Sequence, residues 1–286
     1  MTAAARSPRP ASIDPASLAV FSRLADRLGG LSIGPGKEDF LVARLRHRLS
    51  ALGLEDLAAY AAHLQSPAGA AEATPFIEAL TTHTTRFFRE RVQYDWLRDA
   101  GLPSLETRGA GLSRDLVIWS AACSTGQELY SAMMTAASLG LRDGAELRLR
   151  GVGTDLSQVV LATAGRAVYT TEEIADIPLE LRRRFLLSAR DDSDRVRIGP
   201  DLRRRARWAQ ANLADATTLP PLTADIAMLR NVLIYFDAPT RDRVLRNVIA
   251  RIGQGGYLLT GHSETIDARA YGLTAIRPSI YRKGTE

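Results

Sequence analysis

The stretch that decides the fold is residues 115–139, DLVIWSAACSTGQELYSAMMTAASL. It starts with an apolar run at 116–119 and passes through small residues at 120–126. From 127 onward, apolar residues recur at helical spacing. The stripe consists of Leu129, Ala132, Met133, Ala136 and Ala137. Strand, tight loop and helix in this order predict a βα unit, the unit with which α/β sheets hold nucleotides.

The loop indicates which kind of ligand it suits. The G-x-G-x-x-G spacing of dinucleotide sites is absent, because Gly126 is the loop's only glycine. A pyrophosphate cradle is therefore disfavoured. Glu128 follows the loop directly and would attract a cation. S-adenosylmethionine, with its sulfonium and ammonium groups, fits better than NAD or ATP, and the alternative is a plain strand-loop-helix that holds no ligand.

The composition is that of a globular protein with one large domain or two smaller ones. The chain has 286 residues, of which 45% are hydrophobic and 24% charged. Residues 1–14 lack the apolar stretch of a secretory signal and are expected to form a disordered leader. No apolar run approaches the length of a membrane span, so no membrane insertion is expected. A single cysteine excludes an internal disulfide framework and favours a cytoplasmic location.

The net charge of +5 allows an acidic protein partner or a nucleic acid. Aromatic-interleaved basic strands, zinc-ligand spacing and a recognition-helix signature are all missing from the sequence. We therefore expect no nucleic-acid partner and no metal site.

The first part of the chain predicts a helical domain over 15–100. Three amphipathic stripes lie between residues 15 and 80, and the second carries Arg44, Arg46, His47 and Arg48. This basic cluster is either a solvated face or a docking face for an acidic substrate helix. Next, threonines around His83 predict a loop or cap before a helix at 86–99, where Thr85 and Arg89 could lean together over a neighbouring site.

The rest predicts an α/β domain over 101–286. A strand at 147–154 delivers Asp155, which is either a ribose acceptor or a helix N-cap. Residues 167–208 interrupt the alternation with a helical segment followed by two short strands, and they hold many arginines; an inserted β subdomain at about 177–210 that binds a partner is expected.

After the insertion, the alternation of strands and helices resumes. A strand ends in Arg230-Asn231, a helix covers 239–252, a strand covers 257–260, and a single closing strand covers 275–282. This order predicts a largely parallel sheet. Ligand groups should gather at the carboxyl ends of the strands, which are residues 121–126, Asp155, Asn231 and Gly261-His262.

Seven motifs in fixed order resemble one known family. They are TTHTTRFFRE, IWSAACSTGQELYS, VGTDLS, AVYTTEEI, ANL, LRNVLIYF and GGYLLTGHSE. The chain resembles the CheR-type chemotaxis receptor methyltransferases over about residues 15–283. The resemblance implies a class I, Rossmann-like methyltransferase domain with a mostly parallel sheet, preceded by an all-helical domain and carrying a small inserted β subdomain.

The resemblance also implies an activity and a site. Such an enzyme methylates glutamate side chains on the cytoplasmic helices of chemoreceptors, using S-adenosylmethionine and releasing S-adenosylhomocysteine, and a monomer is expected. By motif position, the cofactor contacts would be His83, Thr85, Arg89, Glu128, Asp155, Asn212, Leu213, Arg230 and Asn231. Tyr235 corresponds to the side chain that the family places near the transferred methyl group.

The sequence departs from the family pattern in places. His83 stands where asparagine is usual, and Gln127 replaces the first of two glutamates, which predicts lower cofactor affinity. The insertion lacks the glycine-flanked turn of members that grip a receptor's C-terminal pentapeptide, which leaves the need for such a tether open.

A methyltransferase acting on another protein or carboxylate, and a non-catalytic scaffold, remain alternatives. Cys123 is expected to be a small loop residue rather than a nucleophile, and GHSE a loop at the acceptor entrance.

Overall fold

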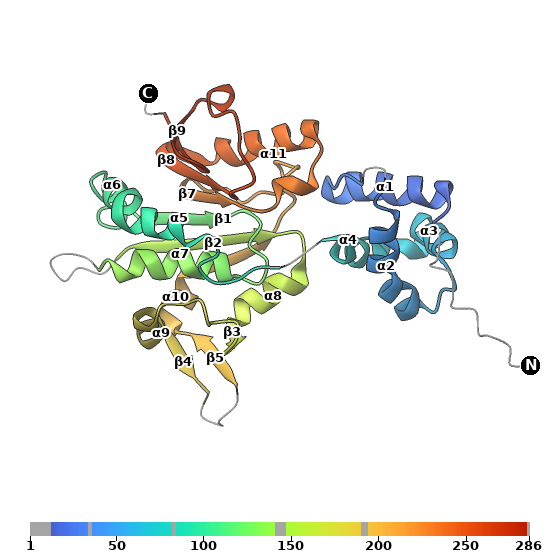
Figure 1. Ribbon diagram of the computed structural model, residues 1–286, viewed down its shortest axis with the longest axis horizontal. Coiled ribbons are helices and arrows are strands. Elements are labelled where there is room, and N and C mark those ends of the chain that lie inside the picture. Colours follow the sequence, from blue (N-terminus) through green and yellow to red (C-terminus); the bar gives the residue numbers. More distant parts are fainter. Residues whose placement is uncertain (1–12, 34–35, 82–83, 141–146, 190–193, 285–286) are drawn as a thin grey trace, which may run out of the picture. The chain divides into compact units, whose positions relative to one another are not determined.

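The computed structural model describes residues 13–33, 36–81, 84–140, 147–189 and 194–284, and the chain forms two compact units, Met1–Thr82 and His83–Glu286 (Figure 1). The sequence-based boundary at residue 100 lies later than this division. Residues 84–100 join the second unit because Phe87, Tyr94 and Leu97 pack into the core that also contains strand residues such as Ile118. Most of the expected leader lies outside the described residues.

The first unit is helical. Its elements are α1 (Pro15–Gly29), α2 (Glu38–Leu52), α3 (Leu57–Gln65), the 3₁₀ helix η1 (Pro67–Glu72) and α4 (Ala73–Leu80). Asp14 caps α1, because its carboxylate accepts hydrogen bonds from the backbone N–H groups of Ala16 and Ser17. The core is aromatic, with the rings of Phe21, Tyr60 and Phe76 within 6.3 Å of one another.

One arginine of the basic cluster serves the interior of this unit. Arg48 donates two hydrogen bonds of 2.7 Å to the carboxylate of Glu72, which is buried and also accepts one of 2.8 Å from the Tyr60 hydroxyl. Arg46 and His47 are exposed. The two readings of the cluster, a solvated face and a docking face, thus concern its other members only.

The second unit contains a seven-stranded sheet in the order β6-β2-β1-β7-β8-β10-β9. The strands are β1 (Leu116–Ser120), β2 (Leu149–Asp155), β6 (Ala206–Gln210), β7 (Ala224–Leu229), β8 (Ile252–Thr260), β9 (Leu273–Arg277) and β10 (Ile280–Lys283). Strands β6, β2, β1, β7 and β8 are parallel, and β10 is antiparallel to β8 and β9. The mostly parallel sheet is confirmed. The single closing strand is wrong, because a turn that contains Ser279 at φ 61° divides it into a hairpin.

Helices cover both faces of the sheet, as Figure 1 shows for α7 and α11. The helices around the sheet are α5 (Arg91–Trp96), a π-helical turn (Leu97–Gly101), α6 (Leu102–Glu106), α7 (Gln127–Ser138), α8 (Gln158–Arg166) and α11 (Ala238–Ala250). Successive residues of β1 enter different cores: Ile118 packs with α7, whereas Trp119 packs with α11. This explains why the strand reads as a continuous apolar run.

The insertion forms a separate antiparallel sheet in the order β3-β5-β4. Its elements are β3 (Val168–Thr170), α9 (Leu179–Phe185), β4 (Leu186–Ser188), β5 (Arg195–Ile198) and α10 (Pro200–Arg205). The sequence placed its start at residue 177 and read 167–170 as helical, but β3 pairs with β5 in this sheet. Residues 206–210 instead form β6, which is an outermost strand of the main sheet and pairs with β2. In the described part of the chain, no helix combines the length and apolar character needed to cross a membrane.

Candidate active site

The predicted ligand groups meet at one edge of the main sheet. Ser120 at the end of β1 is in register with Gly153 of β2 and with Met228 of β7, and Met228 is in register with Leu259 of β8. These four strands therefore end at the same edge. Asp155 is the last residue of β2, and the loop at 121–126, Asn231 and Gly261 follow the ends of β1, β7 and β8, as the sequence predicted.

The loop after β1 is fixed by backbone geometry and by Asp155. Ser124 has φ 48° and Gly126 has φ 95°. A Cβ atom at Gly126 would lie 2.9 Å from Cβ of Ala164 and 3.0 Å from the Trp208 ring, so the position excludes a side chain. The Asp155 carboxylate accepts a hydrogen bond of 2.8 Å from the Ser124 N–H.

Asp155 is not the N-cap of α8. That role belongs to Ser157, whose hydroxyl accepts a hydrogen bond from the Val160 N–H. The N-cap alternative for Asp155 is therefore wrong. Its second carboxylate oxygen accepts a hydrogen bond of 3.1 Å from the Ser157 N–H, and the side chain is half-buried. The carboxylate at the end of β2 thus binds the backbone of two segments, the loop after β1 at Ser124 and the start of α8 at Ser157.

Cys123 lies within the loop and is 1% exposed. Burial raises the pKa of its thiol well above the usual value, and the negative charges of Asp155 and Glu128 add to the rise. The thiol therefore stays protonated and is no nucleophile, as expected. Asp155 accepts a hydrogen bond from the Ser124 N–H and Glu128 accepts one from the Ser120 hydroxyl, so the two carboxylates flank this loop.

Glu128 belongs to a buried network of charges. Its carboxylate accepts hydrogen bonds from the Ser120 hydroxyl at 2.7 Å and from Nη1 of Arg230 at 3.0 Å. Nη2 of Arg230 lies 3.0 Å from Oε2 of Glu90, and Nη1 lies 3.2 Å from the Tyr94 hydroxyl. The Arg230 side chain is 1% exposed. Its guanidinium thus serves this network rather than the surface.

The network shifts the pKa values of its members in opposite directions. Burial raises the pKa of Glu128, although the charge of Arg230 opposes the rise. Burial also acts to raise the pKa of Glu90, but the charge and hydrogen bond of Arg230 outweigh it and lower that pKa. With Asp155 nearby, carboxylates outnumber the guanidinium in this cluster. A ligand that carries a sulfonium and an ammonium suits such an edge.

Residues 87–90 form a turn where the sequence predicted a helix from residue 86. Phe88 has φ 52° and Glu90 has φ 61°, and α5 begins only at Arg91. The Phe88 N–H donates a 3.0 Å hydrogen bond to the Ser131 hydroxyl of α7, which fixes the turn against that helix. The helical prediction is therefore wrong at its start, because contacts with distant residues decide this backbone.

The remaining predicted site residues of the motif TTHTTRFFRE are His83, Thr85 and Arg89. His83 lies outside the described residues. Thr85 is half-buried, and Nη1 of Arg89 donates a 3.2 Å hydrogen bond to the carbonyl of Thr84 rather than pairing with the Thr85 side chain. The backbone carbonyl of Arg89 accepts a hydrogen bond from Arg230. Arg89 is thus tied to the same network as Glu128.

Asn212 and Leu213 follow β6 at the same edge. The neighbouring Ala211 N–H donates a 3.0 Å hydrogen bond to the backbone carbonyl of Asp155. The Asn212 side-chain oxygen accepts a 2.9 Å hydrogen bond from the Ala214 N–H, and Leu213 is buried. The ANL motif therefore lies beside the end of β2.

Tyr235 lies in a short 3₁₀ helix, η4 (Leu233–Tyr235), after the end of β7. Its side chain is half-buried, whereas the neighbouring Ile234 is 58% exposed.

Sequence reasoning missed two carboxylates of this edge, Glu90 and Glu264. The signal available for both was a glutamate at the end of a quoted motif, FFRE and GHSE respectively.

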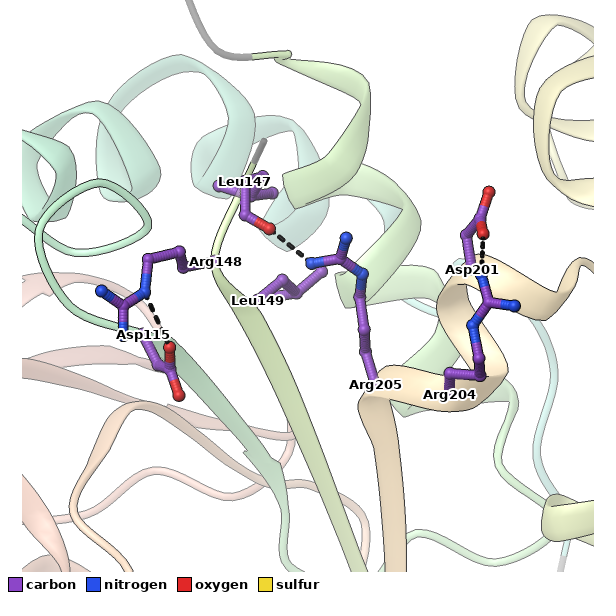
Figure 2. A pocket seen from close by; sticks show the side chains of 7 residues that line it. All are labelled: Asp115, Leu147, Arg148, Leu149, Asp201, Arg204 and Arg205. Carbon is purple, nitrogen blue, oxygen red and sulfur yellow. Dashed lines mark hydrogen bonds and ion pairs between the residues drawn. The ribbon is translucent and has the colours of Figure 1, made fainter. Parts of the chain in front are cut away.

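A cavity of about 430 Å³ lies at the opposite edge of the sheet (Figure 2). It is lined by Asp115, Leu147, Arg148, Leu149, Asp201, Arg204 and Arg205. Two ion pairs of the lining, Arg148–Asp115 at 3.2 Å and Arg204–Asp201 at 2.6 Å, neutralise charge within it. Because Asp115 precedes β1 and Leu149 begins β2, this cavity lies away from the predicted site.

Known proteins are similar to the chain over nearly all of its length. Residues 16–81 match the family model "CheR methyltransferase, all-alpha domain", and residues 83–278 match "CheR methyltransferase, SAM binding domain", where SAM is S-adenosylmethionine. Chemotaxis protein methyltransferase 2 of Pseudomonas aeruginosa is 34% identical over 257 residues, which cover 89% of this chain and 88% of that protein. The chemotaxis protein methyltransferase of Escherichia coli is 33% identical over 263 residues, covering 91% and 88%.

The two matched models follow the two units of the structure in order, and the second covers the edge where the site residues meet. The chain is thus an enzyme that takes S-adenosylmethionine as its cofactor, and it belongs to the CheR methyltransferase family.

Proposed function

We propose that the protein methylates glutamate side chains on the cytoplasmic helices of chemoreceptors, at the strand edge that carries Glu128, Asp155 and Tyr235. The observation that carries the proposal is the convergence of the family's motifs on this edge. Asp155, Asn231 and the loop around Cys123 come from three strands whose register brings their ends together. The names of the relatives, chemotaxis protein methyltransferases, supply the substrate class.

Each site residue has a proposed role. Asp155 accepts from the ribose hydroxyls, and Asn212-Leu213 border the adenine. Glu128 binds the ammonium of the methionine end, while Arg89 binds its carboxylate. His83, Thr85, Asn231 and the backbone of Arg230 complete the pocket, since the Arg230 guanidinium is occupied by Glu128 and Glu90. Tyr235 orients the acceptor carboxylate.

The proposed chemistry needs no general base from the chain. When bound, S-adenosylmethionine supplies an electrophilic methyl group that an ionised carboxylate takes up, which leaves a methyl ester and S-adenosylhomocysteine. A glutamate has an ordinary pKa of about 4.3 and is ionised at neutral pH. The task of the chain is therefore alignment and exclusion of water, and positioning of this kind contributes about 7–11 kcal/mol.

Transfer of a radiolabelled methyl group to purified receptor cytoplasmic fragments tests the proposal. Label that is released by mild base and maps to receptor glutamates supports it. Base-labile label on another protein, or on a small carboxylic acid, would support a methyltransferase with a different substrate. Binding of S-adenosylhomocysteine without any turnover would support a scaffold.

The proposal extends to partner and assembly. The exposed members of the basic cluster on α2, Arg46 and His47, would face the acidic acceptor helix. A monomer in the cytoplasm is part of the same proposal, and the sequence leaves the need for a receptor pentapeptide to experiment. Equilibrium sedimentation, and methylation of receptors with and without their C-terminal residues, would test these points.

A further inference from the structure

A buried carboxylate holds the turn between β7 and Tyr235. Glu264 is 1% exposed. Its Oε2 accepts hydrogen bonds from the Asn231 N–H at 2.6 Å and the Gly261 N–H at 2.9 Å, and its Oε1 accepts one of 2.7 Å from the Leu233 N–H. One side chain thus binds three backbone donors, two of which lie in the segment that leads to Tyr235.

The anchor fixes an unusual backbone conformation. Asn231 has φ 56°, in the left-handed region that asparagine visits more readily than other non-glycine residues. Its N–H and that of Leu233 point at the same carboxylate, which fixes the chain direction just before the 3₁₀ helix that carries Tyr235. Within this helix Leu233 is buried in the core that also contains α11 residues, whereas Ile234 is 58% exposed.

The anchor itself is held from several sides. The Ser279 hydroxyl and the Glu264 N–H both donate to the Gly261 carbonyl, at 3.1 and 2.9 Å. The side-chain amide of Gln93 donates a 2.8 Å hydrogen bond to the Thr260 carbonyl. The turn from Thr260 to Glu264 is therefore a fixed base, against which the Asn231 segment is positioned.

The close approach also explains Gly261. A Cβ atom there would lie 2.6 Å from Oε2 of Glu264, 2.8 Å from Nδ2 of Asn231 and 3.0 Å from the Asn231 backbone nitrogen. Any side chain at this position would push the carboxylate and the Asn231 turn apart. Gly261 thus leaves the room that the Glu264 carboxylate needs to reach the Asn231 N–H, and the two residues lie three apart in the sequence.

We infer that Glu264 is a positioning residue that sets the placement of Tyr235 for methyl transfer, with Gly261 providing the room for it. This inference rests on the proposed function, because it assigns Glu264 a role in that reaction. A glutamine at 264 would turn an amide N–H₂ toward backbone N–H donors, so at least one of the three hydrogen bonds is lost.

A double-variant comparison tests the inference. We expect Glu264→Gln to lower kcat for methylation of a receptor fragment at least tenfold. The Kd of S-adenosylhomocysteine should change less than threefold, because most of its proposed contacts lie elsewhere. In a Tyr235→Phe background, Glu264→Gln should lower kcat less than threefold further, since both changes act through one side chain. Gly261→Ala should repeat this pattern, and Thr265→Ala, at an exposed position next to Glu264 but outside the GHSE loop, should leave kcat unchanged.

The outcomes separate the inference from the function. If Tyr235→Phe lowers kcat and the effects of Glu264→Gln and Tyr235→Phe multiply in full, Glu264 does not act through Tyr235 and the inference is overturned. A merely structural role for Glu264 predicts equal losses of kcat and of cofactor affinity. That result would also overturn the inference. An unmodified protein that transfers no methyl group to receptors would instead refute the proposed function. Glu264→Asp, one methylene shorter, should recover part of kcat if the carboxylate itself is needed.

Discussion

Nη1 of Arg230 lies 3.0 Å from Oε2 of Glu128, so the carboxylate proposed to bind the cofactor's ammonium is already paired with a buried guanidinium. The same guanidinium pairs with Glu90. The site therefore uses Glu128 both as a ligand group and as a partner of Arg230, and a change at Glu128 acts on both functions.

Glu128→Gln should weaken binding of S-adenosylhomocysteine about 10- to 100-fold, because a hydrogen bond to a charged group contributes about 1.5–3 kcal/mol. Isothermal calorimetry measures the effect. Glu180→Gln, at an exposed position in the insertion, should leave the Kd unchanged. An unaltered Kd in Glu128→Gln would remove Glu128 from the pocket.

Asp155→Ala should abolish measurable binding of S-adenosylhomocysteine, because it removes the proposed ribose acceptor and also the carboxylate that holds the Ser124 N–H. Asp155→Asn keeps one acceptor oxygen and should retain weak binding. Calorimetry of both variants, with the exposed Gln158→Ala as control, separates the two functions. Full affinity in Asp155→Ala would contradict the ribose assignment.

Tyr235→Phe should lower kcat about 10- to 100-fold and leave the Kd of S-adenosylhomocysteine near that of the unmodified protein, because the proposed hydroxyl contact is made to the acceptor. Radiolabel transfer gives kcat, and calorimetry gives the Kd. Tyr271→Phe removes a hydroxyl that donates to Asp242 on α11 and serves as the matched control. Equal kcat values for Tyr235→Phe and the unmodified protein would exclude the orienting role.

The first unit should lose stability in acid through Glu72. Burial acts to raise the pKa of Glu72, but hydrogen bonds from Arg48 and Tyr60 outweigh it, so this pKa lies below its usual value. A lowered pKa contributes stability that is complete above the unfolded-state pKa and is lost as the pH falls through the folded-state value. Acidification from pH 7 to pH 4 should therefore begin to lower the melting temperature.

Glu72→Gln should cost about 3 kcal/mol at pH 7, because Arg48 loses its partner, and should reduce the acid sensitivity of melting. Scanning calorimetry at pH 7 and pH 4 measures both quantities. Glu55→Gln changes an exposed glutamate of the same unit and should have little effect. Equal acid shifts in Glu72→Gln and the unmodified protein would show that other groups control the transition.

Gly153→Ala should destabilise the second unit by about 1–3 kcal/mol through overpacking. The new Cβ would lie 2.3 Å from Cζ3 of Trp208 and 3.0 Å from Sγ of Cys123. Gly165 lies in helix α8, and a Cβ atom there would be 3.7 Å from the Trp208 ring, an ordinary contact distance. Gly165→Ala should therefore stabilise the second unit, by about 0.5–1 kcal/mol. Urea unfolding of the two variants gives both signs, and a neutral Gly153→Ala would mean that Trp208 can move aside.

The sequence predicted those parts of the fold that local patterns control. The βα unit at 115–139 and the mostly parallel sheet follow from periodicity and from the order of elements. The common edge of Asp155 and Asn231 follows from the rule that parallel strands end together. None of these inferences requires knowledge of which distant side chains meet.

Contacts between distant residues explain what the sequence did not predict. The turn at 87–90 depends on a hydrogen bond from Phe88 to Ser131, 43 residues away. Strand β3 exists because it pairs with β5 of the insertion. Likewise, Arg48 is indistinguishable from its basic neighbours in the sequence, and only Glu72 draws it inward. Periodicity carries no information about such partners.

Cys123, the only cysteine of the chain, is a buried member of the loop after β1, and its thiol has a raised pKa. In the folded protein this sulfur should resist maleimides and alkylating reagents. A second cysteine introduced on the surface would therefore take a single fluorophore without removal of the natural one. That makes the unaltered enzyme a ready background for fluorescence studies of how it meets its receptors.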